Sequence, residues 1–201
     1  MPNVLISELD QSAALTSGDI VMVMHAAGPP AEYANMAQVA TYVNGTAWGP
    51  GVATPITATG PYAFALASGA DYMFSIQGVV PVTDGDSLTC QFSQSGAYVT
   101  ATTAYNDGAG SGSIVLVSAM GNGAGEGCST EATFPAPGSA GLIKRIQAVG
   151  IRSDTSGNEG AVIGGGRLAA NTNAVDGVRF QFPSGGFATQ GQIVAYVRKW
   201  A

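Results

Sequence analysis

The 201-residue chain is poor in charged residues, in histidine and cysteine, and in long apolar runs. Charged residues make up 10% of it, against about 25% in an average soluble domain, so most of its polarity comes from uncharged groups. Its 7 Lys and Arg against 13 Asp and Glu give a net charge of −6, and no basic stripe is available for nucleic acid. No apolar run approaches the roughly 20 residues of a membrane-spanning helix, so we expect neither nucleic-acid nor membrane binding.

Side chains that carry out catalysis are also scarce. The single histidine, His25, ends an apolar run, and no Gly-x-Ser-x-Gly elbow is present. Most acids stand beside Gly or Ser, as turn formers do, which argues against a positioned carboxylate pair. Asp84-Gly85-Asp86 is too small a set for a calcium site. We expect no catalytic residue, no metal and no cofactor.

The start of the chain favours synthesis in a cytoplasm. Residues 1–8 have no cationic region and turn acidic at once, unlike a secretory signal. Because cytoplasmic thiols stay reduced, Cys90 and Cys128 are expected to be free and partly buried.

Residues 1–43 have the pattern of a small strand-helix unit. Apolar strands are predicted at 4–6 and 20–25, with polar turns between them. Pro30 and the stripe formed by Met36, Val39, Ala40 and Val43 predict a helix over 31–43. Residues 44–61 show no periodicity and are predicted to be a linker.

From residue 62 to 201, short apolar runs separated by turn residues predict an antiparallel β-sandwich. The 29 Gly and 10 Pro are interpreted as turns between strands. The expected strands are 62–66, 72–80, 88–93, 99–105, 113–119, 128–134, 143–153, 161–168, 175–182 and 191–198.

The last two of these strands are predicted to form a β-hairpin closed by the turn at 183–186. Apolar and polar residues alternate along the first strand, and in the second Ile193, Ala195 and Val197 alternate with Gln192, Val194, Tyr196 and Arg198, so each is expected to have one dry face. We expect Arg179 and Gln181 to lie on the opposite face, where they contribute little. The residues expected to hold the core or an oligomer together are Val178, Phe180, Phe182, Ile193 and Val197.

Several segments resemble virion proteins of tailed bacteriophages. "VLISELDQSAALTSGDIVMVMHAAGPPAEYANMAQVATYV" resembles the N-terminal module of tail-fibre and head-fibre proteins, with its Ile-Ser-Glu-Leu strand, Gly-Asp before an apolar strand, and helix ending in Tyr-Val. It departs from them at residues 28–33, where the family often has a polar, basic strand. "AVDGVRFQFPSGGFATQGQIVAYV" resembles the end of their β-sandwich domains. The middle resembles them in "DSLTCQFSQSGAYVTATTAY", "SIVLVS", "GEGCSTEATFPAP" and "KRIQAVG".

The resemblance implies a mainly β protein, in which a small N-terminal strand-helix module precedes a jelly-roll-like antiparallel β-sandwich. It implies a non-enzymatic structural component of a tailed-phage virion, made in the host cytoplasm and assembled as a homotrimer. Symmetric assembly would also hide exposed strand edges. Tail-fibre or tail-tip and capsid-decoration or head-fibre locations both fit. The residues expected to attach the module to other virion proteins are Ile6, Leu9, Ile20, Met22, Met36, Val39 and Val43.

A carbohydrate-binding receptor module is the second class of function that fits, and an enzyme such as a depolymerase is the third. In such a module, aromatic side chains would stack on a host cell-surface glycan. The candidates are Tyr98, Tyr105 and Phe187, with Tyr196 and Trp200 as further candidates. The alternative, that these aromatics belong to the core or to a subunit interface, stays open because alternating strands must bury some of them.

Overall fold

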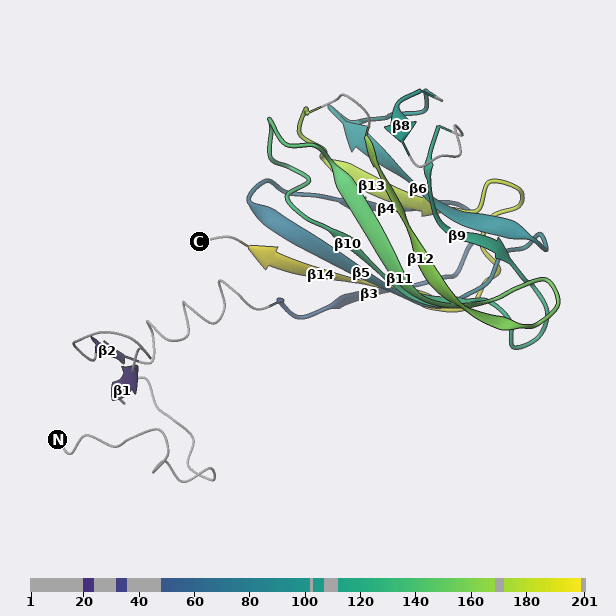
Figure 1. Ribbon diagram of the computed structural model, residues 1–201, viewed down its shortest axis with the longest axis horizontal. Coiled ribbons are helices and arrows are strands. Elements are labelled where there is room, and N and C mark those ends of the chain that lie inside the picture. Colours follow the sequence, from purple (N-terminus) through teal and green to yellow (C-terminus); the bar gives the residue numbers. More distant parts are fainter. Residues whose placement is uncertain are drawn as a thin grey trace. The chain divides into compact units, whose positions relative to one another are not determined.

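The computed structural model describes residues 48–101, 103–106, 112–168 and 172–199, together with the backbone of 20–23 and 32–35. The chain divides into two compact units, residues 1–48 with residue 201, and residues 49–200. Every regular element in the described ranges is a β-strand (Figure 1). No helix long and apolar enough to cross a membrane occurs in them.

The described backbone of the N-terminal unit is a two-stranded antiparallel ladder. β1 (Ile20–Val23) pairs with β2 (Glu32–Asn35). β1 falls within the predicted strand at 20–25. β2 shows that the start of the helix predicted over 31–43 is wrong, because cross-strand pairing with β1 overrides the local helix propensity of these residues. The other predicted attachment residues lie outside the described ranges, namely Ile6, Leu9, Met36, Val39 and Val43.

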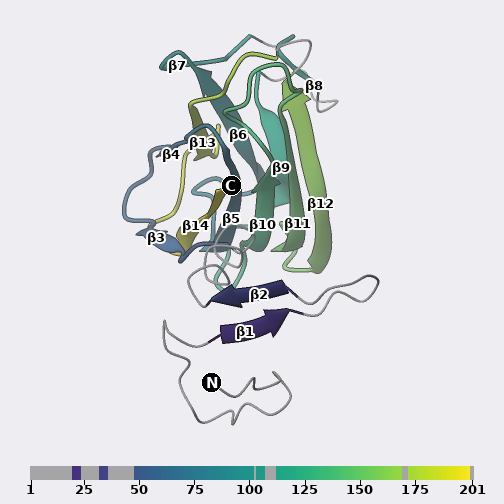
Figure 2. The same ribbon diagram turned by 90° about the vertical axis from the view of Figure 1, so that its left-hand side faces the viewer.

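The second unit contains two antiparallel sheets. The larger has seven strands in the order β3-β14-β5-β10-β11-β12-β8, and Figure 2 shows β3 to β12 following one another in this order. Their bounds are β3 (Val52–Pro55), β5 (Ala70–Val79), β8 (Tyr105–Asn106), β10 (Cys128–Phe134), β11 (Arg145–Ser153), β12 (Glu159–Leu168) and β14 (Gln192–Lys199). The five-stranded sheet contains β4 (Tyr62–Ala65), β13 (Gly177–Gln181), β6 (Asp86–Gln94) and β7 (Ala97–Tyr98) in this order, with β9 (Ile114–Met120) also paired to β6.

Side chains that alternate between buried and exposed along the strands form the core between the sheets. Along β10 every second residue, from Cys128 to Phe134, is buried, and the residues between them are exposed. This is the period of a strand with one dry face. The two sheets together therefore enclose one hydrophobic core.

Aromatic rings join the two sheets across that core. The ring centroids of Phe74 in β5 and Phe180 in β13 are 5.0 Å apart in an edge-on contact. Phe92 in β6 stacks on Phe134 in β10 at 4.5 Å. All four rings are 0% exposed, and each pair has one member in each sheet.

The chain passes repeatedly from one sheet to the other. β3, β5 and β10 belong to the larger sheet, and β4, β6 and β9 to the smaller one. β11 and β12 then extend the larger sheet beyond β10 as an antiparallel pair. Finally, β13 enters between β4 and β6, and β14 enters between β3 and β5. The two chain-terminal strands thus complete both sheets.

The predicted closing hairpin is therefore wrong. The apolar face predicted for β13 is correct, whereas β14 buries Val194 as well as Ile193. Val178, Phe180, Phe182 and Ile193 are buried, and Val197 packs against the core. However, β13 and β14 lie in different sheets, as the two separate yellow strands of Figure 1 show. The connection between them carries Phe187, whose buried ring contacts Tyr62 at 5.2 Å and Phe182 at 4.8 Å. Anchoring this ring in the core lets the connection cross between the sheets.

Two further sequence predictions need correction. Residues 44–61 were predicted to be a linker, but residues 49–61 belong to the second unit, since β3 pairs with β14 and Ile56 is only 3% exposed. Turn-rich composition obscured this short edge strand. The strand predicted at 99–105 is replaced by β7 and β8 on either side of an irregular segment.

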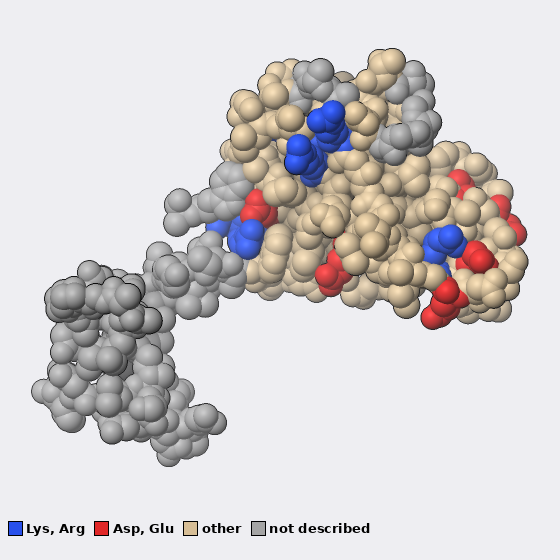
Figure 3. All heavy atoms as spheres, viewed as in Figure 1, with Lys and Arg blue, Asp and Glu red and all other residues tan. Residues whose placement is uncertain are grey.

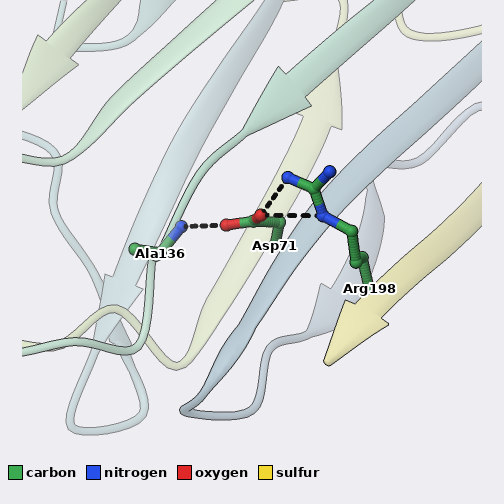
Figure 4. A network of polar contacts seen from close by, with 3 residues as sticks. All are labelled: Asp71, Ala136 and Arg198. Carbon is green, nitrogen blue, oxygen red and sulfur yellow. Dashed lines mark hydrogen bonds and ion pairs between the residues drawn. The ribbon is translucent and has the colours of Figure 1, made fainter. Parts of the chain in front are cut away.

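One carboxylate ties together three segments at the end of the larger sheet (Figure 4). Asp71 in β5 accepts hydrogen bonds from Nε and Nη2 of Arg198 in β14, at 3.1 and 2.6 Å. Its other oxygen accepts the backbone N–H of Ala136 at 3.0 Å. Asp71 is buried, so these charge-assisted bonds offset the desolvation of its carboxylate.

Truncating Phe180 to Ala tests the contact between the sheets. The buried ring touches Phe74 and Phe64, at 5.0 and 5.9 Å between centroids, so its loss should leave a cavity. We expect the free energy of unfolding to fall by about 3–5 kcal/mol. Gln181 is a partly exposed neighbour, and in denaturant titrations Gln181→Ala should change the free energy of unfolding by less than about 0.5 kcal/mol. Equal losses in the two variants would contradict a one-sided core contact.

Two glycines of β12 offer a matched pair of substitutions. A Cβ at Gly164 would overlap the carbonyl oxygen of Leu116 in β9, whereas a Cβ at Gly160 meets no atom of the described residues within 4 Å. Gly164→Ala should therefore lower the free energy of unfolding by about 1–3 kcal/mol through overpacking. Gly160→Ala should leave the melting temperature unchanged or slightly raised. Similar melting curves for both variants would mean that β9 does not cross β12 so closely.

Candidate functional site

The described residues do not assemble a metal centre or a carboxylate pair. Among them, no three His, Cys, Asp or Glu side chains gather as metal ligands would. Asp86 accepts the backbone N–H groups of Ser87 and Ser184, both at 2.8 Å, and Asp84 accepts that of Asn122 at 3.3 Å. Both carboxylates therefore stabilise loops by accepting backbone hydrogen bonds. His25 lies outside the described ranges.

Shifted pKa values in this unit have local structural causes. Burial raises the pKa of Tyr105 and that of the Cys128 thiol, each to about 12. Backbone N–H groups of Ser156 and Asn158 lower the pKa of Asp154 within its own turn. For Asp176, the Ser93 side chain and then the Gly96 N–H lower the pKa. Each shift thus follows from burial or from a turn that the group stabilises.

Lys144 is a fully buried amine that holds the loop between β10 and β11. Its Nζ donates to the carbonyl oxygens of Ser139 and Leu142, the latter at 2.8 Å. Its own carbonyl accepts the N–H of Leu168 at the end of β12. Burial lowers the pKa of this ammonium group. Because the side chain is 0% exposed, its role is to fix the loop.

The most distinctive polar cluster outside the core surrounds Arg179 in β13. Its Nε and Nη2 both donate to Oε1 of Gln91 in β6, at 2.8 and 2.5 Å. Its guanidinium carbon lies 4.1 Å from the centre of the Tyr98 ring in β7. No carboxylate of the described residues pairs with Arg179, since the ion pair found there joins Arg198 and Asp71. We call these three residues the Arg179 cluster.

Hydrogen bonds from neighbouring segments orient the other two members of the cluster. Nε2 of Gln91 donates to the carbonyl oxygen of Gly112 at 2.8 Å, which turns Oε1 toward Arg179. Next to Tyr98, the Val99 carbonyl accepts the hydroxyl of Tyr105 at 2.9 Å. The same hydroxyl accepts the N–H of Phe92 at 2.9 Å. Buried Tyr105 therefore fixes the backbone that carries Tyr98.

This arrangement suits an anionic or hydroxyl-rich ligand. The Nε edge of the guanidinium is occupied by Gln91, and the stacked ring of Tyr98 restricts its rotation. The remaining N–H groups are two on Nη1 and one on Nη2, and the Nη1–Nη2 edge is a fork that carboxylates and phosphates accept. Arg179 and Tyr98 are partly exposed, so a ligand has access to them.

The aromatic residues chosen from the sequence separate into two groups. Tyr98 is partly exposed and belongs to the Arg179 cluster. Tyr105 and Phe187 were candidates for receptor contact, but they are 5% and 0% exposed and belong to the core. Their rings face inward because one contacts Phe92 and the other Phe182.

Sequence reasoning missed Arg179 and Gln91. Arg179 was expected to lie on the face of a hairpin that contributes little to stability. Gln91 lies in a stretch of β6 where consecutive residues are buried. The alternation of β13 places Arg179 on the outward face but does not indicate its partners. Its contact with Gln91 requires the pairing of β13 with β6, which joins residues 88 positions apart.

Comparison with known proteins adds no relative. No protein family, curated protein or solved structure matches this chain.

The buried Lys144 predicts a specific pH dependence. A lysine whose pKa is lower in the folded than in the unfolded state makes the unfolded state bind more protons between the two values, so stability rises with pH there. As pH rises toward the ordinary value of 10.5, wild type should gain stability relative to Lys144→Met. Tyr105 and Cys128 are present in both proteins, so their contributions to the pH dependence of stability cancel in the difference between wild type and variant. A stability difference that stays constant from pH 7 to 10.5 would contradict a lowered pKa.

Proposed function

We propose that this chain is a non-enzymatic structural component of a tailed-phage virion, of tail-fibre or tail-tip type. Its N-terminal unit joins other virion proteins, and its β-sandwich is displayed outward as part of a homotrimer made in the host cytoplasm. The resemblance of residues 4–43 to phage attachment modules motivates this function.

The order of the strands is the structural observation that supports the proposal most. β3, β14, β5 and β10 stand side by side in one sheet, and β4, β13, β6 and β9 do so in the other. Eight strands alternating between two sheets in this way match the jelly-roll arrangement that the resemblance implies. Viral capsid domains commonly use this arrangement.

The surface of the second unit is also consistent with a role in assembly. Large apolar side chains are exposed on it, including Ile163 at 84% and Val52 at 69%. Figure 3 shows a broad expanse without charged side chains on one side of the unit. Such surfaces are typical of proteins that bind other proteins. A capsid decoration protein or head fibre would use the same features and is the alternative location.

Deleting residues 1–43 tests the attachment role. The second unit has its own core and lies outside this segment, so the truncated protein should stay folded, with a melting temperature within a few degrees of the full chain. It should be absent from purified particles, as measured by quantitative mass spectrometry of particles produced with each version. Incorporation of the truncated protein at the full-length level would show that attachment lies elsewhere.

The Arg179 cluster favours a second candidate function, binding of an acidic host glycan. Its guanidinium is oriented by Gln91 and stacked on Tyr98, and no acidic partner occupies it among the described residues. A uronate or sialate carboxylate would receive a forked pair of hydrogen bonds from it.

Substitutions within the cluster test this binding. Arg179→Ala and Tyr98→Ala should each weaken binding of an acidic oligosaccharide about tenfold or more, because one loses the fork and the other its orientation. Tyr98→Phe keeps the ring and should bind like wild type. Isothermal titration calorimetry of wild type and each variant, with an acidic and with a neutral oligosaccharide, measures these affinities. Binding that survives Arg179→Ala unchanged, or equal affinity for neutral sugars, would exclude this cluster as a carboxylate site.

A further inference from the structure

The outward side of β10, β11 and β12 carries a contiguous set of exposed apolar residues. Val149 and Ile151 in β11 are 52% and 51% exposed, and Ile163 in β12 is 84% exposed. The register places Val149 opposite Ile163 and Ile151 opposite Ala161, so these side chains are neighbours on one face. A cluster of branched apolar side chains on the outside of a sheet is a typical contact surface. We call this surface the β10–β12 face.

Charges at the edges of this face are not neutralised within the described unit. Arg145 stands directly opposite Arg167 in the ladder, and both side chains are exposed. Like charges in this position repel each other. The ion pair present in the described ranges involves neither of them. Glu131 in β10 is also exposed, stands opposite Val149, and takes no part in that ion pair.

The β10–β12 face is therefore complementary to itself. It holds an arginine pair at one end, an apolar centre, and a carboxylate beside that centre. Two copies brought together through it would bury the apolar residues and place the arginines of one copy near Glu131 of the other. In a symmetric assembly every copy contributes the same groups, so each such contact forms more than once.

Net charge favours this face over the rest of the surface. The chain has a net charge of −6, so two copies repel each other where acids gather. In the described unit, the loops at one end carry Glu126 and Asp154, and β12 begins at that end with the exposed Glu159. On the β10–β12 face the two arginines, Arg145 and Arg167, are balanced by two carboxylates, Glu131 and Glu159. Copies can therefore approach through it without net repulsion.

We propose that this chain binds a second copy of itself through the β10–β12 face. Because a face complementary to itself joins copies in pairs, this contact is additional to the three-fold contacts of the proposed homotrimer, and the inference rests on the proposed function for its biological role. Its test is the mass of the purified full-length protein in solution. The virion role is tested on particles, so either can fail without the other.

Light scattering coupled to size exclusion tests the apolar centre. The full-length wild type should have a mass of two or more chains of 20.1 kDa. Val149→Asp combined with Ile163→Asp should give the mass of one chain with an unchanged melting temperature, because both side chains are exposed in the single chain. Val82→Asp is the matched control, since Val82 is exposed at 46% in the loop after β5, and it should keep the wild-type mass.

A charge exchange tests the complementarity and identifies the partner. Glu131→Arg alone, and Arg145→Glu with Arg167→Glu, should each weaken self-association about tenfold or more. Combining all three substitutions in one chain should restore association, because every copy then offers the reversed set.

Three results would overturn the proposal. One is a single-chain mass for wild type at concentrations up to about 100 μM, since weaker association corresponds to less than roughly 5–6 kcal/mol. Another is an unchanged mass for the Val149 and Ile163 double variant. The third is failure of the triple variant to recover while its melting temperature matches wild type, which would mean that Glu131 does not pair with the two arginines of another copy.

Discussion

The contact between Phe rings of opposite sheets is the interaction on which the second unit depends. Phe74 meets Phe180, and Phe92 stacks on Phe134, so both pairs link strands that are distant in sequence. With charged residues at 10% of the chain and one ion pair in the described ranges, electrostatics contributes little to holding the sheets together. Burial of these rings contributes about 1.5–3 kcal/mol each to the favourable free energy that holds the two sheets together.

The sequence predicts most strands but not their partners. Alternation in Cys128–Phe134 and in Gly177–Gln181 identifies which side chains face inward, and the structure buries those residues. The same alternation fits a hairpin and a crossing between sheets equally well. The crossing is marked by the burial of Phe187 in the core and by the different partners of β13 and β14, and nothing local in the sequence indicates either. For the same reason Phe187 and Tyr105 resembled surface aromatics in the sequence.

The candidate sites differ in how visible they are in the sequence. Tyr98 could be selected as an aromatic beside a turn, but its stacking on Arg179 depends on pairing between β6 and β13. The β10–β12 face depends on pairing between β11 and β12, which brings Val149 to Ile163 and Arg145 to Arg167. Both surfaces lie on the outer sides of the sheets, where aromatic packing inside leaves the facing side chains accessible to partners.

The proposed virion role requires the N-terminal unit to join one assembly and the β-sandwich to display a surface to another. Antibody labelling of intact phage particles, raised against residues 49–200 and imaged by electron microscopy, examines that role most directly. Labels should appear at one fixed position on every particle, at the tail for the tail-fibre type and on the head for the decoration type. Intact particles that carry no label, while the same antibody binds the purified protein, would contradict a structural role in the virion.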